Sequence, residues 1–80
     1  MQNNWTEADN TLHRTITFAD FKEALVFVNK VGEIAEGLQH HPDICIKDYK
    51  KVFISSTTHE NGNRITTKDR DLIKAIDEIG

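Results

Sequence analysis

The sequence predicts an α+β fold in which two helices pack on one face of a small antiparallel sheet. Three observations indicate it: strand-like alternation over residues 12–18, a long helical pattern after it, and strand-like runs followed by a second helical pattern. The expected order is β-(β)-α-β-β-α, with one optional strand before the first helix.

The composition is typical of one soluble globular domain, which we expect to span residues 1–80. Hydrophobic residues make up 38% of the chain and charged residues 29%. The net charge of −3 gives no support to a broad nucleic-acid footprint, which would need a basic patch. No apolar run approaches the ~20 residues of a membrane span. The single Cys45 cannot form an internal disulfide, and residues 1–10 do not resemble a signal peptide. We therefore expect a cytoplasmic protein.

In the first predicted strand, apolar and polar residues alternate, which indicates one buried face and one exposed face. Leu12, Ile16 and Phe18 share one parity, and Arg14 interrupts this apolar side. His13 lies on the polar side, where we expect a structural role.

The first helix carries signals at both ends. Asp20 and Glu23 form a D-x-x-E start signal, and Thr17 with Asp20 offers a second one. Gly37 and then Pro42 mark the predicted end.

The apolar residues of this helix form two stripes that are together wider than one face of a sheet needs. One stripe comprises Phe21, Leu25, Val28, Ala35 and Leu38, and the other comprises Phe27, Val31, Ile34 and Leu38. Two interpretations remain open: the helix is well buried, or the second stripe meets another subunit.

The second half of the chain predicts two strands, or one bent strand, and a final helix. The strand signals are Ile44 with Ile46 and residues 52–54, and Tyr49 breaks the parity between them, which indicates a bulge or tight turn. Residues 60–63 form a turn signal. Thr66 to Asp69 resembles a capping box that opens a helix with an apolar side of Leu72, Ile73, Ile76 and Ile79.

Three of the four histidines lie at the ends of predicted elements. His40 and His41 follow the first helix, and His59 follows the last strand-like run. Imidazole can give and take a proton near neutral pH, so three such groups in one pocket would suit proton transfer on a small molecule. Each one alone could equally be an ordinary surface residue.

A metal site is a weaker interpretation of the same residues. The spacing of His40, His41, Cys45 and His59 is not that of a zinc finger, and no CxxC pair is present. Neighbouring residues in an extended chain also point to opposite sides. Cys45 lies in an apolar strand and is expected to be buried and inert. We predict no metal.

One spaced set of residues resembles the signature of the pterin-4a-carbinolamine dehydratase family, which includes dimerisation cofactors of a homeodomain transcription factor. The set is Glu36, His40-His41-Pro42, Tyr49, His59 and Asp69. The strings HHPDI, STTH and GNRITTKD, and FADF at the start of the first helix, are similar to that family too. The resemblance covers about Trp5 to Ile79. Longer members carry a helix before the first strand, which this chain is expected to lack.

The resemblance implies dehydration of a 4a-hydroxytetrahydropterin to quinonoid dihydropterin, without a metal or redox cofactor. It implies that His40 and His59 are the acid–base pair and that His41 mainly holds the pterin. Pro42 and Tyr49 would shape the pocket, and Asp69 would orient a histidine. Glu36 matches the signature without an evident role.

The family also implies a homodimer with a continuous sheet, or a homotetramer formed through the long helix. The expected partner is the pterin, with no direct nucleic-acid or membrane contact, and the transcriptional role is not carried over. Two rival hypotheses remain: a non-catalytic assembly module with the same fold, and an enzyme that acts on another pterin-like or heterocyclic ligand.

Overall fold

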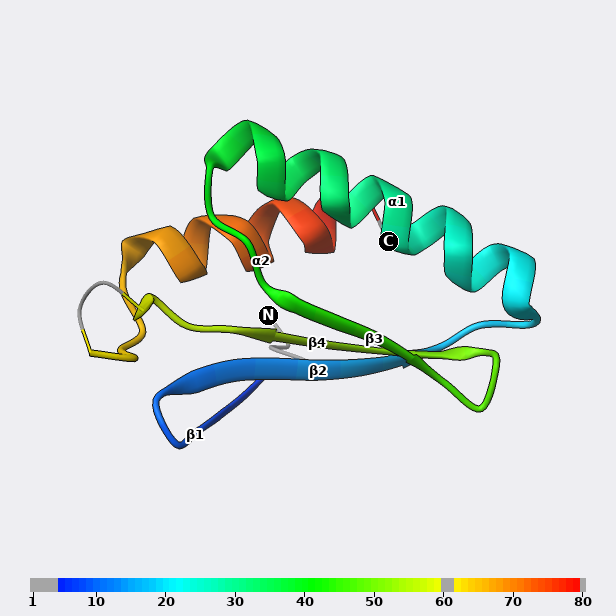
Figure 1. Cartoon of the computed structure of the whole chain (residues 1–80), viewed down its shortest axis with the longest axis horizontal. Helices are drawn as coiled ribbons and strands as arrows, with labels where there is room; N and C mark the ends of the chain where they lie inside the picture. Colours follow the sequence, from blue (N-terminus) through cyan, green and yellow to red (C-terminus); the bar gives the residue numbers. More distant parts are fainter. Residues whose placement is uncertain (1–4, 60–61, 80) are drawn as a thin grey trace.

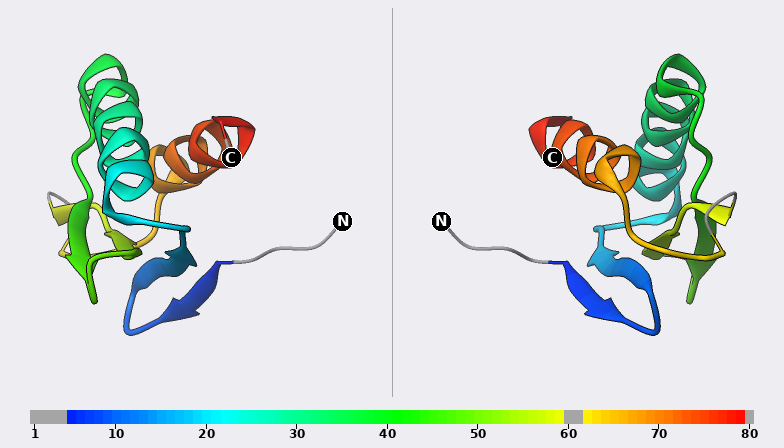
Figure 2. Two further views of the ribbon diagram at one scale, coloured as in Figure 1. Left: turned by 90° about the vertical axis from the view of Figure 1, so that its right-hand side faces the viewer. Right: turned by 90° about the vertical axis from the view of Figure 1, so that its left-hand side faces the viewer.

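Four antiparallel strands form one layer of the structure and two helices form the other. The computed structural model describes residues 5–59 and 62–79. In chain order the elements are β1 (Thr6–Ala8), β2 (Thr11–Thr17), α1 (Phe21–Leu38), β3 (Asp43–Lys47), β4 (Lys51–Ser56) and α2 (Thr67–Ile79). The strands lie in the order β1-β2-β4-β3, and neighbours are antiparallel. Both helices cover the same face of the sheet, so the predicted α+β fold is confirmed (Figure 1 and Figure 2).

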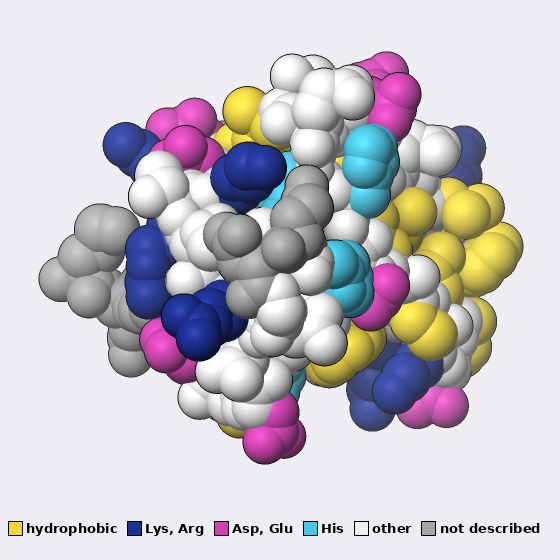
Figure 3. All heavy atoms as spheres, turned by 60° about the vertical axis from the view of Figure 1, so that its left-hand side comes forward, with side chains coloured by type: hydrophobic (Ala, Val, Ile, Leu, Met, Phe, Trp, Pro, Cys, Tyr) yellow, Lys and Arg dark blue, Asp and Glu magenta, His cyan; other side chains and the backbone are white. Residues whose placement is uncertain are grey.

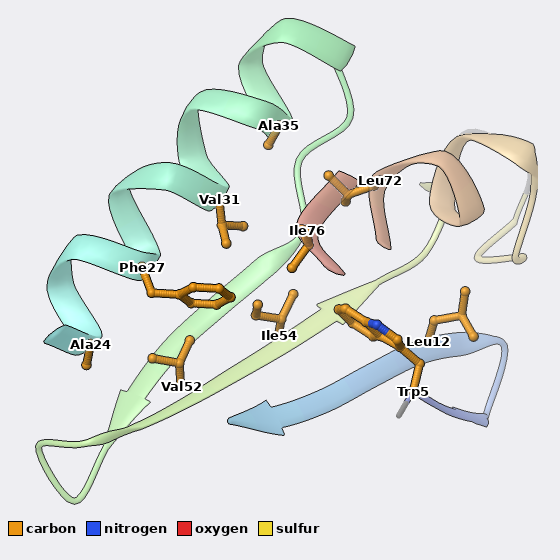
Figure 4. Close-up of a cluster of buried hydrophobic side chains, with 10 residues drawn as sticks. All are labelled: Trp5, Leu12, Ala24, Phe27, Val31, Ala35, Val52, Ile54, Leu72 and Ile76. Atoms are coloured by element: carbon orange, nitrogen blue, oxygen red, sulfur yellow. The ribbon is translucent and has the colours of Figure 1, made fainter. Parts of the chain in front are cut away.

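The core lies between the sheet and the two helices (Figure 4). Its buried apolar members are Trp5, Leu12, Ala24, Phe27, Val31, Ala35, Val52, Ile54, Leu72 and Ile76. Trp5 precedes β1, and its indole Nε1 donates a hydrogen bond to Asp77 of α2 at 2.9 Å. This contact anchors the start of the described chain to α2.

The arginine that interrupts the apolar side of β2 is paired with α2. Arg14 lies on the same side of the strand as Leu12, and its Nη1 donates to Asp77 Oδ1 at 2.9 Å. His13 lies on the opposite side, where its ring centroid is 5.8 Å from that of Phe53. The charge of Arg14 is therefore accommodated at the margin of the core.

Helix α1 begins at the predicted capping signal. Asp20 is the N-cap residue, and its side chain accepts a hydrogen bond from the Glu23 backbone N–H at 2.8 Å. The Glu23 carboxylate accepts one from the Ala19 backbone N–H at 3.2 Å. This reciprocal pair satisfies two N–H groups that the helix cannot bond internally.

Helix α1 ends between the two predicted end signals, one residue past Gly37 and before Pro42. The helix continues to Leu38, and Gln39 takes the left-handed conformation, with φ of 54°. Glycine favours this conformation, but Gln39 is held in it because its side-chain Nε2 donates to the Glu36 carbonyl at 2.7 Å. The next residue, His40, donates its backbone N–H to the Ala35 carbonyl at 3.1 Å.

The assignment of the two α1 stripes is also corrected. Phe27 and Val31, which were candidates for contact with another subunit, are 6% and 0% exposed in the chain's own core. Phe21 and Leu25, from the other stripe, are 48% and 40% exposed. Since α1 packs against α2 as well as the sheet, the buried arc of α1 is rotated toward α2 relative to the prediction.

Strands β3 and β4 are separate strands joined by a tight turn. Asp48 and Tyr49 both have left-handed φ values, 49° and 54°, and the Lys50 backbone N–H donates to the Lys47 carbonyl at 3.2 Å. Cys45 is exposed rather than buried, because Ile44 and Ile46 face the core and alternation turns Cys45 to the other face of the sheet.

The capping box at the start of α2 is confirmed. Lys68 donates its backbone N–H to Thr66 Oγ1 at 3.3 Å, and Thr66 donates its own to Asp69 Oδ2 at 2.9 Å. Residues 60 and 61 of the predicted turn lie outside the described residues. No helix in the described part of the chain has the length and apolar character needed to cross a membrane.

Candidate functional site

The three candidate histidines meet at the end of the sheet where α1 stops and β4 leaves the ladder. A pocket of about 250 Å³ there is lined by Gln39, His40, His41, Thr57 and His59. Histidine side chains gather on one face of the molecule in Figure 3. The structure therefore brings together residues that are up to 19 positions apart in the sequence.

His40 is the buried member of the group. It is 7% exposed, and its Nε2 lies 2.6 Å from Asp69 Oδ1. A carboxylate only accepts hydrogen bonds, so this contact places a ring hydrogen on Nε2. The other ring nitrogen, Nδ1, is then left for the pocket that His40 lines.

Asp69 is fully buried and saturated with hydrogen-bond donors. Oδ1 accepts from His40 and from Ser56 Oγ at 2.6 Å, and Oδ2 accepts from Thr58 Oγ1 at 2.7 Å and the Thr66 backbone N–H at 2.9 Å. Burial by itself raises the pKa of a carboxyl group, but these hydrogen bonds outweigh it and lower the pKa of Asp69 to about 2. Asp69 is therefore a buried anion at neutral pH.

His41 has the opposite environment from its neighbour. Its side chain is 59% exposed, and its Nε2 lies 2.5 Å from Oε1 of Glu36, which lies in the last turn of α1. The left-handed Gln39 and the extended chain before Pro42 turn His40 inward and His41 outward. Glu36, which had no evident role in the sequence, is thus the partner of His41.

His59 lies on the loop that follows β4, and its contact is with an amide. Its Nδ1 is 2.8 Å from Asn63 Oδ1. Two backbone hydrogen bonds between Thr58 and Arg64, of 2.9 and 3.3 Å, close the base of this loop. His59 and Asn63 are the next residues inward from that closure, so they face each other.

Neither of the two predicted pocket-shaping residues is among the residues that line the pocket in this chain. Pro42 directly follows His41 and is half-buried at the start of β3. Tyr49 is 60% exposed in the turn between β3 and β4. All of β4 separates that turn from the histidine pocket, so the structure does not bring Tyr49 to the pocket of its own chain (Figure 1).

The surroundings of the histidines do not form a metal-ligand cluster. Among residues 5–59 and 62–79, no group of three or more His, Cys, Asp or Glu side chains could hold a metal ion. A larger hollow of about 560 Å³ lies between the start of α1 and the end of α2, but it contains none of the predicted site residues.

Sequence reasoning missed Ser56, Thr58 and Asn63. The first two share a parity with Val52 and Ile54, so two hydroxyls on a buried strand face were a signal that a buried polar group needed donors. Asn63 gave only a turn signal, because its contact with His59 depends on how the loop closes.

The arrangement can transfer protons to and from a small bound molecule. One imidazole is fixed by a buried anion, a second by an exposed carboxylate and a third by an amide, and all three line one pocket. Groups that titrate near neutral pH and are held in place can serve as general acids and bases.

Comparison with known proteins gives a consistent result. The family model described as pterin 4 alpha carbinolamine dehydratase matches residues 1–79. A protein of Sulfurisphaera tokodaii, provisionally named pterin-4-alpha-carbinolamine dehydratase, is 48% identical over 75 residues, which cover 94% of this chain and 78% of that protein. A protein of Nostoc punctiforme with the same provisional name is also 48% identical, over the same shares of the two chains.

Two solved structures share the fold. The crystal structure of a transcriptional coactivator/pterin dehydratase from Brucella melitensis has a TM-score of 0.86 and 28% identity, covering 96% of this chain and 82% of that chain. A pterin dehydratase-like RuBisCO assembly factor of the alpha-carboxysome has a TM-score of 0.77 over 95% of this chain and 88% of that chain, at 18% identity, which shows the fold alone. By the extent of the family match and the identity to its relatives, this chain belongs to the pterin-4-alpha-carbinolamine dehydratase family.

Proposed function

We propose that the chain is a 4a-hydroxytetrahydropterin dehydratase, a hydro-lyase that produces quinonoid dihydropterin and water. The observation that carries the proposal is the buried His40–Asp69 pair in the wall of a pocket that His41 and His59 also line. At about 250 Å³ the pocket lies just below the usual range for ligand sites, roughly 300–1,000 Å³, so it would take a small ligand. The family membership supports the same substrate class.

The reaction needs one proton donor and one proton acceptor. The bond between C4a and its hydroxyl oxygen breaks, and the oxygen leaves as water after it receives a proton. A ring N–H loses its proton, and the electron pair forms the new C=N bond. The carbon skeleton neither gains nor loses electrons overall, so the reaction requires no redox partner.

We assign the residue roles from the family resemblance, and the position of each side chain supports them. His40 and His59 form the acid–base pair, and each contributes ~10²–10⁴-fold to the rate. Asp69 orients His40 and fixes its tautomer. His41, steadied by Glu36, mainly holds the pterin, since its exposed ring lies on the outer rim of the pocket.

The test compares three single substitutions in a dehydration assay. His40→Ala and His59→Ala should lower kcat more than His41→Ala, which should mainly raise KM because it removes binding contacts. Circular dichroism on each variant confirms that it is folded. A larger kcat loss in His41→Ala than in the other two would overturn these roles.

The rival hypothesis is a non-catalytic assembly module with the same fold. The likeness to the RuBisCO assembly factor admits such a module but shows the fold only. The presence of all three histidines in one pocket, with the buried Asp69 bonded to one of them, favours an enzyme, because a module that only assembles other proteins needs no set of proton-transfer groups. A folded protein that gives no rate increase over buffer would support the module.

We also propose that the protein is a homodimer or homotetramer. Phe21, Leu25, Val26 and Leu38 of α1 are 40–48% exposed. An 80-residue chain buries a modest core, so covering these side chains in an oligomer would add stability.

A further inference from the structure

The three pocket histidines differ in the charge of the group that holds them. His40 contacts the Asp69 carboxylate and His41 the Glu36 carboxylate, each through Nε2. His59 contacts a neutral amide oxygen, that of Asn63, through Nδ1. This difference separates a histidine suited to carry a proton from one suited to accept it.

Backbone hydrogen bonds of the loop hold His59 and Asn63 close to each other. The backbone pairing of Thr58 with Arg64 closes the loop base, and the Gly62 N–H donates to the His59 carbonyl at 3.1 Å. Asn63 has a left-handed φ of 60°. Asparagine tolerates this conformation better than most residues, so it supplies a side-chain acceptor where the backbone would otherwise favour glycine.

We propose that Asn63 is a positioning residue for His59: its amide oxygen fixes the ring hydrogen on Nδ1, leaves Nε2 unprotonated for the pocket, and so makes His59 the base and His40 the acid. This inference rests on the proposed dehydratase function and adds to it the direction of proton flow.

The neutral partner matters because a carboxylate in the same place would favour the imidazolium form of His59. An amide oxygen accepts the Nδ1 hydrogen without adding a negative charge. The titratable groups that share the pocket with His59 are His40, with Asp69 behind it, and His41, with Glu36 behind it. A proton on His40 or His41 would further oppose a second positive charge on His59.

The proton balance is complete with these two residues. The His40 imidazolium donates its Nδ1 proton to the leaving hydroxyl, which departs as water. His59 Nε2 accepts the proton from the ring N–H. The cycle ends with His40 neutral and His59 protonated, and exchange with solvent restores both.

The test uses two variants of Asn63 and one control. Asn63→Asp keeps the size and the tolerance for a left-handed φ but adds a charge. Asn63→Gly removes the side chain without backbone strain. Asn29→Asp adds the same charge at an exposed position of α1, ten residues before Gln39 and therefore ~15 Å away along the helix.

Titration of the ring nitrogens by ¹⁵N NMR gives a readout that does not depend on activity. Wild-type His59, when neutral, should carry its hydrogen on Nδ1. In Asn63→Asp the titration of His59 should move upward by about one pH unit, because a carboxylate stabilises the imidazolium. Asn29→Asp should leave it in place. A wild-type His59 with its hydrogen on Nε2 would overturn the proposal.

The pH–rate profile gives the second readout. In Asn63→Asp the low-pH side of the profile should move upward with the His59 titration, and in Asn63→Gly kcat should fall about tenfold as the tautomer is released. An active wild type whose profile is unchanged in Asn63→Asp refutes the role of Asn63. A wild type that shows no dehydration while the NMR result holds refutes the proposed function instead.

Discussion

At the scale of single residues, the three histidines of the pocket differ because their neighbouring groups differ. His40 is buried against an anion, His41 is exposed beside a carboxylate, and His59 is exposed beside an amide. Asp69 connects this local chemistry to the fold, because it also caps α2 through the Thr66 N–H.

The first prediction concerns the link between Asp69 and His40. Asp69→Asn keeps the shape but replaces an anion that fixes the His40 tautomer with an amide that can present either a donor or an acceptor. We expect kcat to fall roughly 10–100-fold with a smaller change in KM. Steady-state kinetics measures both, and Asp48→Asn, which removes the same charge at an exposed position of the turn between β3 and β4, serves as the control.

Equal kcat values for Asp69→Asn and wild type would contradict the role of the anion. A fall in kcat that is explained by unfolding would be visible in the thermal melting curve, so the assay temperature is set below the transition of the variant.

The second prediction is the acid sensitivity of the fold. The pKa of Asp69 is about 2 in the folded state, below its ordinary value of 3.8, so the ionised carboxylate stabilises the native state. On the order of 2 kcal/mol of stability is present above about pH 4 and is lost as the pH falls toward 2. Urea unfolding at several pH values should show the stability gap between wild type and Asp69→Asn closing across this window. A gap that stays constant down to pH 2 would contradict it.

At the scale of elements, the orientation of α1 decides which of its apolar side chains pack against α2 and the sheet. Val31 is fully buried, whereas Val26 is 47% exposed, although both are valines on the same helix. They therefore form a matched pair for testing the orientation of the helix.

The third prediction uses this pair. Val31→Ala should lower the free energy of unfolding by about 2 kcal/mol, since it removes buried methyl groups and leaves a cavity. Val26→Ala should change it by less than about 0.5 kcal/mol in a monomer. Urea denaturation measures both values at a protein concentration where light scattering shows a monomer, and a loss for Val26→Ala as large as that for Val31→Ala would contradict this orientation of α1.

At the scale of the whole molecule, most of the fold could be predicted because local signals agree with it. Alternation in β2, the D-x-x-E cap of α1 and the capping box of α2 each depend on neighbours in sequence. The exchange of the α1 stripes could not be predicted, because the buried arc depends on where α2 packs.

The site was predictable to a similar extent. The three histidines were indicated by their positions at element ends, and the family resemblance added Asp69. The structure brings these four residues together, while Ser56, Thr58 and Asn63 came only from the folded contacts. Tyr49 shows the limit of spacing: it matches the signature but lies in the turn at the opposite end of β4.

The fourth prediction is the oligomeric state. Light scattering should give a mass of two or four times the 9.2 kDa of one chain, because the exposed apolar side chains of α1 favour association. If the oligomer forms through α1, Leu25→Glu should lower the measured mass, because it places a charge in the contact between the chains. A wild-type mass of 9.2 kDa at assay concentrations would contradict the prediction.

The most direct test of the central claim is the rate of dehydration of a 4a-hydroxytetrahydropterin generated in situ, followed by absorbance with and without purified protein. We predict that wild type accelerates the loss of the 4a-hydroxyl in proportion to enzyme concentration, and that folded His40→Ala loses most of this acceleration. A folded wild type that leaves the rate at its buffer value would contradict the account.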